Sequence, residues 1–320
     1  MDIVACTDNH FVMQTGIMMQ SVCINNLGVS ITFHIISDES LETKDKEDLK
    51  SVISKFSDKH ILFYNIDGAS FNNMPALGVI TTITKATYYR FELTTILSES
   101  INKVLYLDGD IIVRHSLEPL WNTDIDNYAV AAVPDYNEAV IEKENYLQIN
   151  PLCGYFNAGV MLINLKYWRD HHLREQFYEY TKDNFDRIVY RDQDVLNYVL
   201  NEKKLMLDIK FNLGGGWLYV IPGYDTYKYA KQLEEARKDP VIVHYTTSKP
   251  WYVYNRHPHP YRTLFFKYRN QTKWKDEPLL DDRPIMRRVI KCIATTMRKW
   301  GVLPELPPNG HEYIDIEPID

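Results

Sequence analysis

The sequence predicts one large α/β domain with a mostly parallel central sheet, and two observations favour this class. Short apolar runs alternate along the chain with stretches of helical periodicity, which is typical of strands joined by crossover helices. The chain also has 320 residues, of which 45% are hydrophobic and 25% are charged, so it can bury a core of its own. Its four cysteines show neither C-x-x-C spacing nor a zinc pattern, and we expect reduced thiols.

The expected elements follow from these local patterns. In residues 41–56, for example, Leu49, Val52 and Phe56 recur at helical spacing opposite a charged face. We expect strands at 2–7, 31–37, 61–66, 128–135 and 156–165, and we find further apolar runs at 103–113, which two aspartates break, at 206–212 and at 241–247. We expect helices at 11–26, 41–56, 85–97, 166–182, 192–203 and 224–237. The connections 136–152 and 213–223 are long enough to be functional loops.

The composition changes near residue 255, so we expect a main domain over 1–255 and a small helical extension over 256–320. Within the extension, a basic stretch at 283–304 without acids precedes a tail at 305–320 that has acids but no Lys or Arg. Residues 283–300 place Val289, Ile293 and Trp300 on one helical stripe, with Arg and Lys opposite. This pattern indicates either an amphipathic helix on an anionic membrane or a helix packed on the domain.

The charge balance and the N-terminus bear on partners and location. The formal net charge is −7, which argues against nucleic-acid binding. No apolar run approaches the roughly 18 residues of a membrane span, and the first residues, MDIVACTDNH, lack the basic start of a signal peptide. We therefore expect a cytoplasmic protein, peripheral on the inner face of the membrane if residues 283–300 bind lipid.

The strongest local signal is Asp108-Gly109-Asp110, at the end of an apolar run. Ligands bind at the carboxyl ends of strands in α/β sheets. Side chains two residues apart on an extended chain point the same way, so the two carboxylates repel each other unless a cation lies between them. The motif therefore indicates a hard divalent cation, although a polar turn after a strand would have the same residues.

Other segments carry polar groups that such a site would use. His244 ends an apolar run and Lys249 follows it, so an imidazole could complete a metal site and a lysine could bind phosphate; a buried core histidine is the alternative. Asp192 and Gln193 lie where a helix should begin, and acids there also complement the helix dipole. Asn157 opens a strand, where tight packing is the alternative; Arg90 could reach a phosphate or snorkel to solvent.

Taken together, these segments resemble glycosyltransferase family 8, the bacterial lipooligosaccharide galactosyl- and glucosyltransferases related to glycogenin. The matching strings are MDIVACTDNH, TKATYYRF, KVLYLDGDIIV, YFNAGVMLINL, YRDQDVLN and HYTTSKPW. They occur in the family's order and cover the predicted main domain, 1–255. There are two departures: Thr7-Asp8 stands where many relatives have two acids, and the loop 245–248 has no glycine.

The resemblance implies a GT-A fold, a nucleotide-sugar-binding α/β sandwich. It also implies transfer of galactose or glucose from a UDP-sugar to a saccharide or glycolipid acceptor, with retention of configuration, in lipopolysaccharide or surface-glycan synthesis. By matched position, it implies Mn²⁺, or Mg²⁺, at Asp108, Asp110 and His244. It further implies that uridine contacts Thr7, Asp8 and Asn9, that the diphosphate contacts Lys249, and that the donor sugar is surrounded by Arg90, Asn157, Asp192 and Gln193, the last two being the catalytic pair. The connections 136–152 and 213–223 would meet the acceptor.

Two other functions fit parts of the sequence. A phosphohydrolase of the haloacid-dehalogenase type also has a D-x-D motif after a strand, but on its first strand rather than at 108–110. A catalytically inactive sugar-nucleotide-binding protein would keep the same residues. The amide of Gln193 is a poor nucleophile. If the chain is a retaining transferase, we therefore expect attack from the face that UDP leaves rather than a covalent glycosyl-enzyme.

Overall fold

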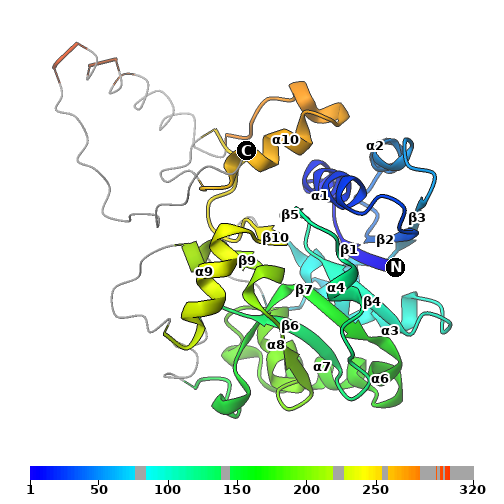
Figure 1. Cartoon of the computed structure of the whole chain (residues 1–320). Coiled ribbons are helices and arrows are strands. Elements are labelled where there is room, and N and C mark those ends of the chain that lie inside the picture. The colour runs from blue at the N-terminus through cyan, green and yellow to red at the C-terminus, as the bar shows by residue number, and fades with distance from the viewer. Residues whose placement is uncertain are drawn as a thin grey trace.

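A computed structural model describes residues 1–75, 84–137, 145–218, 227–253 and 259–281, together with 293, 296, 297 and 300–302. Over these residues the predicted α/β class is confirmed. A seven-stranded sheet has the order β3-β2-β1-β4-β7-β6-β8 (Figure 1). Its strands are β1 (Asp2–Cys6), β2 (Ile31–Ser37), β3 (Lys59–Asn65), β4 (Lys103–Leu107), β6 (Val130–Pro134), β7 (Phe156–Asn164) and β8 (Lys204–Met206). All neighbouring pairs are parallel except those made by β7, which runs antiparallel to β4 and β6.

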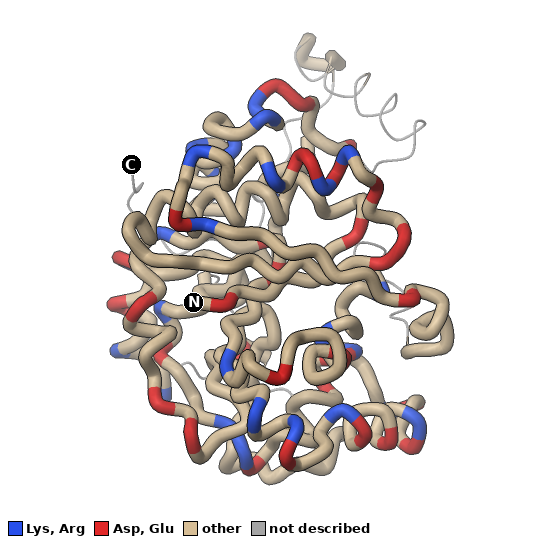
Figure 2. Tube along the Cα trace, turned by 90° about the vertical axis from the view of Figure 1, so that its right-hand side faces the viewer, with Lys and Arg blue, Asp and Glu red and all other residues tan. Residues whose placement is uncertain are grey.

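Each face of this sheet has its own apolar core. Side chains alternate along a strand, so Ile3 and Ala5 of β1 face one way and Val4 faces the other. The first core includes α1 (Val12–Asn25) and α2 (Thr43–Ile53). The second includes α6 (Leu165–Asp170), α7 (Leu173–Asp183) and α8 (Asp192–Val199). The sheet therefore lies between two helical layers, and most charged residues lie on the outer turns and helices (Figure 2).

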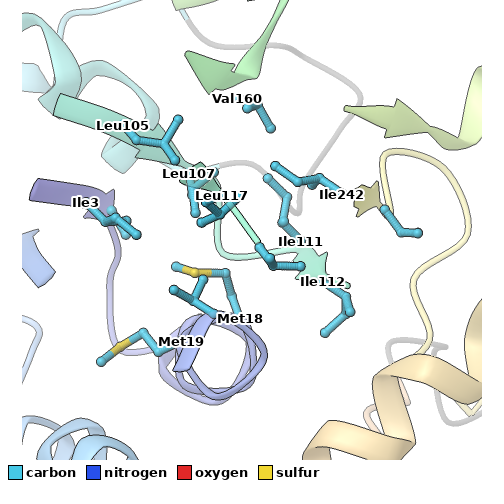
Figure 3. Close-up of a cluster of buried hydrophobic side chains, with 14 of the residues drawn as sticks. Ile3, Met18, Met19, Leu105, Leu107, Ile111, Ile112, Leu117, Val160 and Ile242 are labelled. Atoms are coloured by element: carbon cyan, nitrogen blue, oxygen red, sulfur yellow. The ribbon is translucent and has the colours of Figure 1, made fainter. Parts of the chain in front are cut away.

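The apolar run 103–113 is divided at its two aspartates, because the chain leaves the large sheet at Asp108. Residues Ile111–Val113 form β5 of a second, three-stranded sheet with β10 (Ile242–His244) and β9 (Leu213–Gly214). Apolar side chains of β4 and β5 meet in the core around α1, as Figure 3 shows for Leu107, Ile111, Ile112 and Met18. The Asp108-Gly109-Asp110 segment is therefore the crossing point between the two sheets.

Two predicted helices also differ from the structure. Residues 85–97 begin as a 3₁₀ helix, η2 (Lys85–Glu92), and only α3 (Leu93–Ile96) is α-helical. Aromatic side chains fill this stretch, and Tyr88, Tyr89 and Phe91 are all buried, so tertiary packing decides its conformation. The predicted helix 166–182 is broken between α6 and α7, because His172 has a φ of 50°, in the left-handed region that cannot continue a helix.

The remaining described elements are short. The predicted helix 224–237 is represented by η7 (Tyr227–Tyr229) and α9 (Ala230–Lys238), since its first residues lie outside the described part of the chain. The others are η1 (Gly68–Phe71), α4 (Glu118–Trp121), η3 (Pro151–Cys153), η4 (Phe185–Arg187), η5 (Ile209–Phe211), η6 (Gly215–Leu218), α10 (Arg262–Arg269) and η8 (Lys273–Asp276).

The described part of the predicted extension, 259–281, packs on α1. The amide of Asn25 donates to the Tyr268 hydroxyl at 2.7 Å, and Trp274 is buried over Gly16. The division at residue 255 stays a prediction. Most of the basic segment 283–300 lies outside the described residues. In the part of the chain that the structure describes, no helix is long and apolar enough to cross a bilayer.

Candidate active site

Three predicted metal ligands lie together where the two sheets meet. Potential ligand atoms of Asp108, Asp110 and His244 are all within 4.8 Å of one another. The register explains this arrangement, because His244 of β10 pairs with Ile111, directly after Asp110. The His244 Nε2 atom lies 3.0 Å from Asp110 Oδ1 and 3.9 Å from Asp108 Oδ2. His244 and Asp110 are nearly buried, whereas the Asp108 side chain is 29% exposed, so the cluster opens to solvent through Asp108.

The hydrogen bonds around His244 show which of its ring nitrogens faces the carboxylates as an acceptor. The backbone N–H of Gly159 donates to Asn157 Oδ1 at 3.0 Å, and the Asn212 Nδ2 atom donates to the same oxygen at 2.9 Å. The other amide atom of Asn212, its oxygen, therefore accepts the proton of His244 Nδ1 at 3.0 Å. In the neutral ring, the lone pair of His244 Nε2 then faces Asp110 Oδ1. Two acceptor atoms this close repel each other unless a proton or a metal ion lies between them.

This donor set fits the expected metal. Two carboxylates and one imidazole suit Mn²⁺ or Mg²⁺, and the Asn212 bond to the far ring nitrogen is the support that metal-bound histidines usually have. The backbone also leaves room at this point. A Cβ atom on Gly159 would lie 2.2 Å from His244 Cε1 and 2.8 Å from Asp108 Oδ2. Only glycine lets β7 pass this close to the cluster.

Two cations neutralise the aspartates. Arg90 is 3% exposed, donates from Nη2 to Asp108 Oδ1 at 3.0 Å, and lies over the Tyr106 ring at 4.2 Å. The Lys249 ammonium forms a short contact with Asp110 Oδ2. Burial disfavours the ionised form of Asp110, but Lys249 and His244 outweigh it and hold the pKa of that carboxyl well below its usual range. Both predicted anion-binding cations therefore lie at the carboxylate pair.

The residues predicted around the donor sugar form a connected network beside this cluster. Asp192 forms an ion pair with Arg90, with 3.1 Å between Oδ2 and Nε, and it accepts a hydrogen bond from the Thr87 hydroxyl. Burial raises the pKa of Asp192 above its usual value, although Arg90 opposes this. The Gln193 amide is engaged at both ends: its Oε1 accepts from the Ala158 N–H at 3.0 Å, and its Nε2 donates to Asp135 Oδ2 at 3.3 Å.

Asp135 and Asn212 complete the network and were not predicted from the sequence. The Asp135 Oδ2 atom also accepts from Asn157 Nδ2 at 2.8 Å, and burial raises the pKa of Asp135. A signal for Asp135 existed, because it directly follows the strand β6, at the same kind of carboxyl end that drew attention to Asp108. Asn212 follows a 3₁₀ turn and has no comparable pattern in the sequence.

The predicted uridine-binding residues lie on the loop after β1, next to the crossing segment. The Thr7 hydroxyl lies 3.0 Å from that of Thr15, and a Cβ atom on Gly109 would lie 2.8 Å from the same Thr15 oxygen. Asp8 accepts from the His10 N–H at 2.9 Å, while Asn9 is exposed. Thr7 is thus linked through Thr15 to the crossing segment, and the contacts of all three residues with a nucleotide stay a prediction.

A carboxylate pair and a histidine at the carboxyl end of a central strand, with two cations beside them, are typical of the active site of an α/β enzyme. Comparison with known proteins identifies the family: residues 2–253 match the model of glycosyl transferase family 8, and the chain belongs to that family. The predicted resemblance is confirmed, and the phosphohydrolase alternative is set aside.

Several relatives are similar over most of the chain. General stress protein A of Bacillus subtilis is 31% identical over 86% of this chain and 94% of its own. Lipopolysaccharide 1,3-galactosyltransferase of Salmonella typhimurium is 28% identical over 91% of this chain and 83% of its own. The crystal structure of the galactosyltransferase LgtC with donor and acceptor sugar analogs is 25% identical, with a TM-score of 0.75 over 90% of this chain and 99% of that one. The predicted sandwich fold is therefore confirmed.

Proposed function

We propose that this protein is a retaining glycosyltransferase that moves galactose or glucose from a UDP-sugar to a saccharide or glycolipid acceptor, in lipopolysaccharide or other surface-glycan synthesis. The cluster of Asp108, Asp110 and His244 carries this proposal, because it combines a metal-type donor set with the family's fold. The relatives support the sugar class, since those named above include a lipopolysaccharide galactosyltransferase and another, from Escherichia coli, is a lipopolysaccharide glucosyltransferase.

The metal ligands in this proposal are Asp108, Asp110 and His244, with Mn²⁺ favoured over Mg²⁺ because an imidazole takes part. When bound, the ion supplies Lewis-acid stabilisation of the negative charge on the departing diphosphate. Lys249 adds a second positive charge for the diphosphate, and the loop Thr7-Asp8-Asn9 contacts uridine. Arg90, Asn157, Asp192 and Gln193 surround the donor sugar.

The hydrogen bonds of the sugar site favour attack on the face from which UDP departs. A covalent glycosyl-enzyme needs a free, charged nucleophile, but Gln193 is neutral and its oxygen accepts from Ala158. Asp192 is bound to Arg90 and Thr87. We infer that the bond between C1 and the diphosphate oxygen breaks, the acceptor hydroxyl oxygen bonds to C1 on the same face, and its proton passes to the departing oxygen. Trapping a sugar on Gln193 or Asp192 would contradict this route.

We also propose that the protein works in the cytoplasm and contacts the inner face of the membrane through the basic segment 283–300. A glycolipid acceptor would be reached most easily from that surface. The arrangement of apolar and basic residues in the sequence supports this idea, since each basic residue near an anionic membrane contributes about 1 kcal/mol to the free energy of binding.

A panel of UDP-sugars tests the proposed activity. We expect hydrolysis of UDP-galactose or UDP-glucose that depends on added Mn²⁺ and is lost with a chelator, and we expect transfer of the same hexose when an oligosaccharide acceptor is supplied. GDP-mannose serves as the control donor and should not be cleaved. UDP binding without turnover of any donor would instead support the inactive sugar-nucleotide-binding protein.

A further inference from the structure

A buried carboxylate outside the predicted site, Asp194, collects four hydrogen bonds. Its Oδ2 atom accepts from the backbone N–H groups of Val189 and Tyr190, each at 2.7 Å. Its Oδ1 atom accepts from the hydroxyls of Tyr155 at 2.7 Å and Tyr146 at 3.0 Å. Asp194 is 0% exposed and belongs to the first turn of α8. It therefore joins the start of this helix to the turn before it and to the segment 145–155.

The Tyr155 hydroxyl connects Asp194 to Gln193 in the proposed sugar site. Its hydroxyl donates to Asp194 and accepts from Gln193 Nε2 at 3.1 Å. The ring is completely buried in a small cluster with Leu147 and Ile149, so the hydroxyl has little freedom to move. The other amide atom of Gln193 accepts from the Ala158 N–H, and Nε2 also donates to Asp135, so three contacts together determine which way the amide faces.

Tyr146 also bonds to Asp194 but, among the described hydrogen bonds, not to Gln193. Its hydroxyl donates to the same carboxylate oxygen, and no described hydrogen bond joins it to Gln193. The two tyrosines therefore separate two roles. Both stabilise the Asp194 anchor, but only Tyr155 extends from that anchor to the amide.

We propose that Tyr155 is a positioning residue for the transfer reaction, whose hydroxyl, held by Asp194, acts with Asp135 and the Ala158 N–H to orient the Gln193 amide against the donor sugar. This inference rests on the proposed function of Gln193. It predicts an effect on turnover rather than on donor binding, because uridine and diphosphate are bound by other residues. An amide turned by half a rotation would place an N–H where the oxygen belongs, opposite the Ala158 N–H.

The test compares Tyr155→Phe with the matched control Tyr146→Phe in the full chain, using Mn²⁺ and the UDP-sugar that the wild type turns over. We expect Tyr155→Phe to lower kcat about fivefold to tenfold, the effect of one lost neutral hydrogen bond, with KM for the donor unchanged. The assay is hydrolysis of the UDP-sugar without an acceptor, so that the predicted acceptor contacts of 136–152 play no part, and Tyr146→Phe should leave kcat close to that of the wild type. In the Gln193→Ala background, Tyr155→Phe should have no further effect on kcat, because the group it positions is gone.

A second measurement does not depend on activity. The side-chain amide NMR signal of Gln193, identified by its loss in Gln193→Ala, should shift in Tyr155→Phe and stay in place in Tyr146→Phe. Equal kcat and an unmoved signal in Tyr155→Phe would overturn the proposal, as would a much larger loss of thermal stability than in Tyr146→Phe, which would show a structural role. A wild type without turnover would count against the proposed function, and the NMR comparison would still decide the inference.

Discussion

Gly159 is the residue at which the backbone comes closest to the proposed metal site. Any side chain there would overlap His244 and Asp108, with a Cβ atom 2.2 Å from the His244 ring. We expect Gly159→Ala to push His244 from its place and to lower the affinity for Mn²⁺ by about tenfold or more, measured by calorimetric titration in the presence of UDP. Gly214→Ala is the matched control, because the nearest atom to its Cβ would be the Thr246 hydroxyl at an ordinary 3.4 Å. Equal affinities in the two variants would argue against the metal assignment.

The substitution Asp108→Asn tests the charge of the proposed metal site rather than its shape. Asn at this position can still accept from Arg90 and Tyr106, but it loses the negative charge that a cation requires. We expect Asp108→Asn to reduce turnover of the UDP-sugar by about a hundredfold or more, with an unchanged melting temperature. Wild-type turnover in this variant would remove Asp108 from the metal site.

A substitution at Lys249 tests the diphosphate contact separately from the uridine contact. It contacts Asp110 at the proposed metal site and would bind the diphosphate. We expect Lys249→Ala to weaken UDP binding about tenfold to a hundredfold, the effect of losing one charge-assisted hydrogen bond, and to leave uridine binding unchanged. Calorimetry with both ligands checks this, and an equal loss for both would contradict a diphosphate contact.

At the scale of elements, Glu92 links the end of η2 to α7. Its carboxylate accepts from Arg174 Nε at 2.8 Å and from the Tyr178 hydroxyl at 2.6 Å. Burial alone would raise the pKa of Glu92, but these hydrogen bonds outweigh it and hold the pKa below the usual 4.5. The ionised group therefore stabilises the fold above about pH 4.5, and this contribution is lost as the pH falls through the lower pKa of the folded state.

We expect Glu92→Gln to lower the free energy of unfolding by about 1–3 kcal/mol at neutral pH, since Arg174 loses its charged partner. The difference from the wild type should shrink in acid, because the wild-type carboxylate is then protonated as well. Urea denaturation at about pH 7 and about pH 3 measures both values. A difference that is the same at both pH values would show that the charge of Glu92 does not stabilise this link.

At the scale of the whole molecule, the proposed membrane contact depends on the basic segment 283–300. We expect the full chain to float with liposomes that contain anionic lipid, because several Arg and Lys residues add their attraction to an apolar stripe. A truncation at residue 282 should stay unbound. A full-length control with Arg283, Arg287 and Arg288 changed to Gln should bind more weakly, and equal flotation of all three proteins would reject the membrane contact.

Local patterns in the sequence predicted most of the fold. The strand at 31–37 and the helix at 11–26 lie within a residue of β2 and α1, since apolar periodicity reports directly which face of an element is buried. The failures occur where distant packing overrides local preference. The 3₁₀ turns of η2 depend on buried aromatic rings, and the break between α6 and α7 depends on one left-handed residue, His172.

The sequence by itself determined the class of fold, the order of the elements and the carboxylate pair, and its ordered motifs pointed to the family. Only the tertiary structure decided which side chains meet. His244 reaches Asp110 across 134 residues of chain, and Tyr155 reaches Asp194 across 39. Asn212 and Tyr155 carry no sequence signal of their function, and Asp135 has only its place after a strand, because hydrophobic periodicity describes burial and not partners. Their roles depend on strand register and on β7 passing the cluster at Gly159, and both are set by the packing of the two sheets.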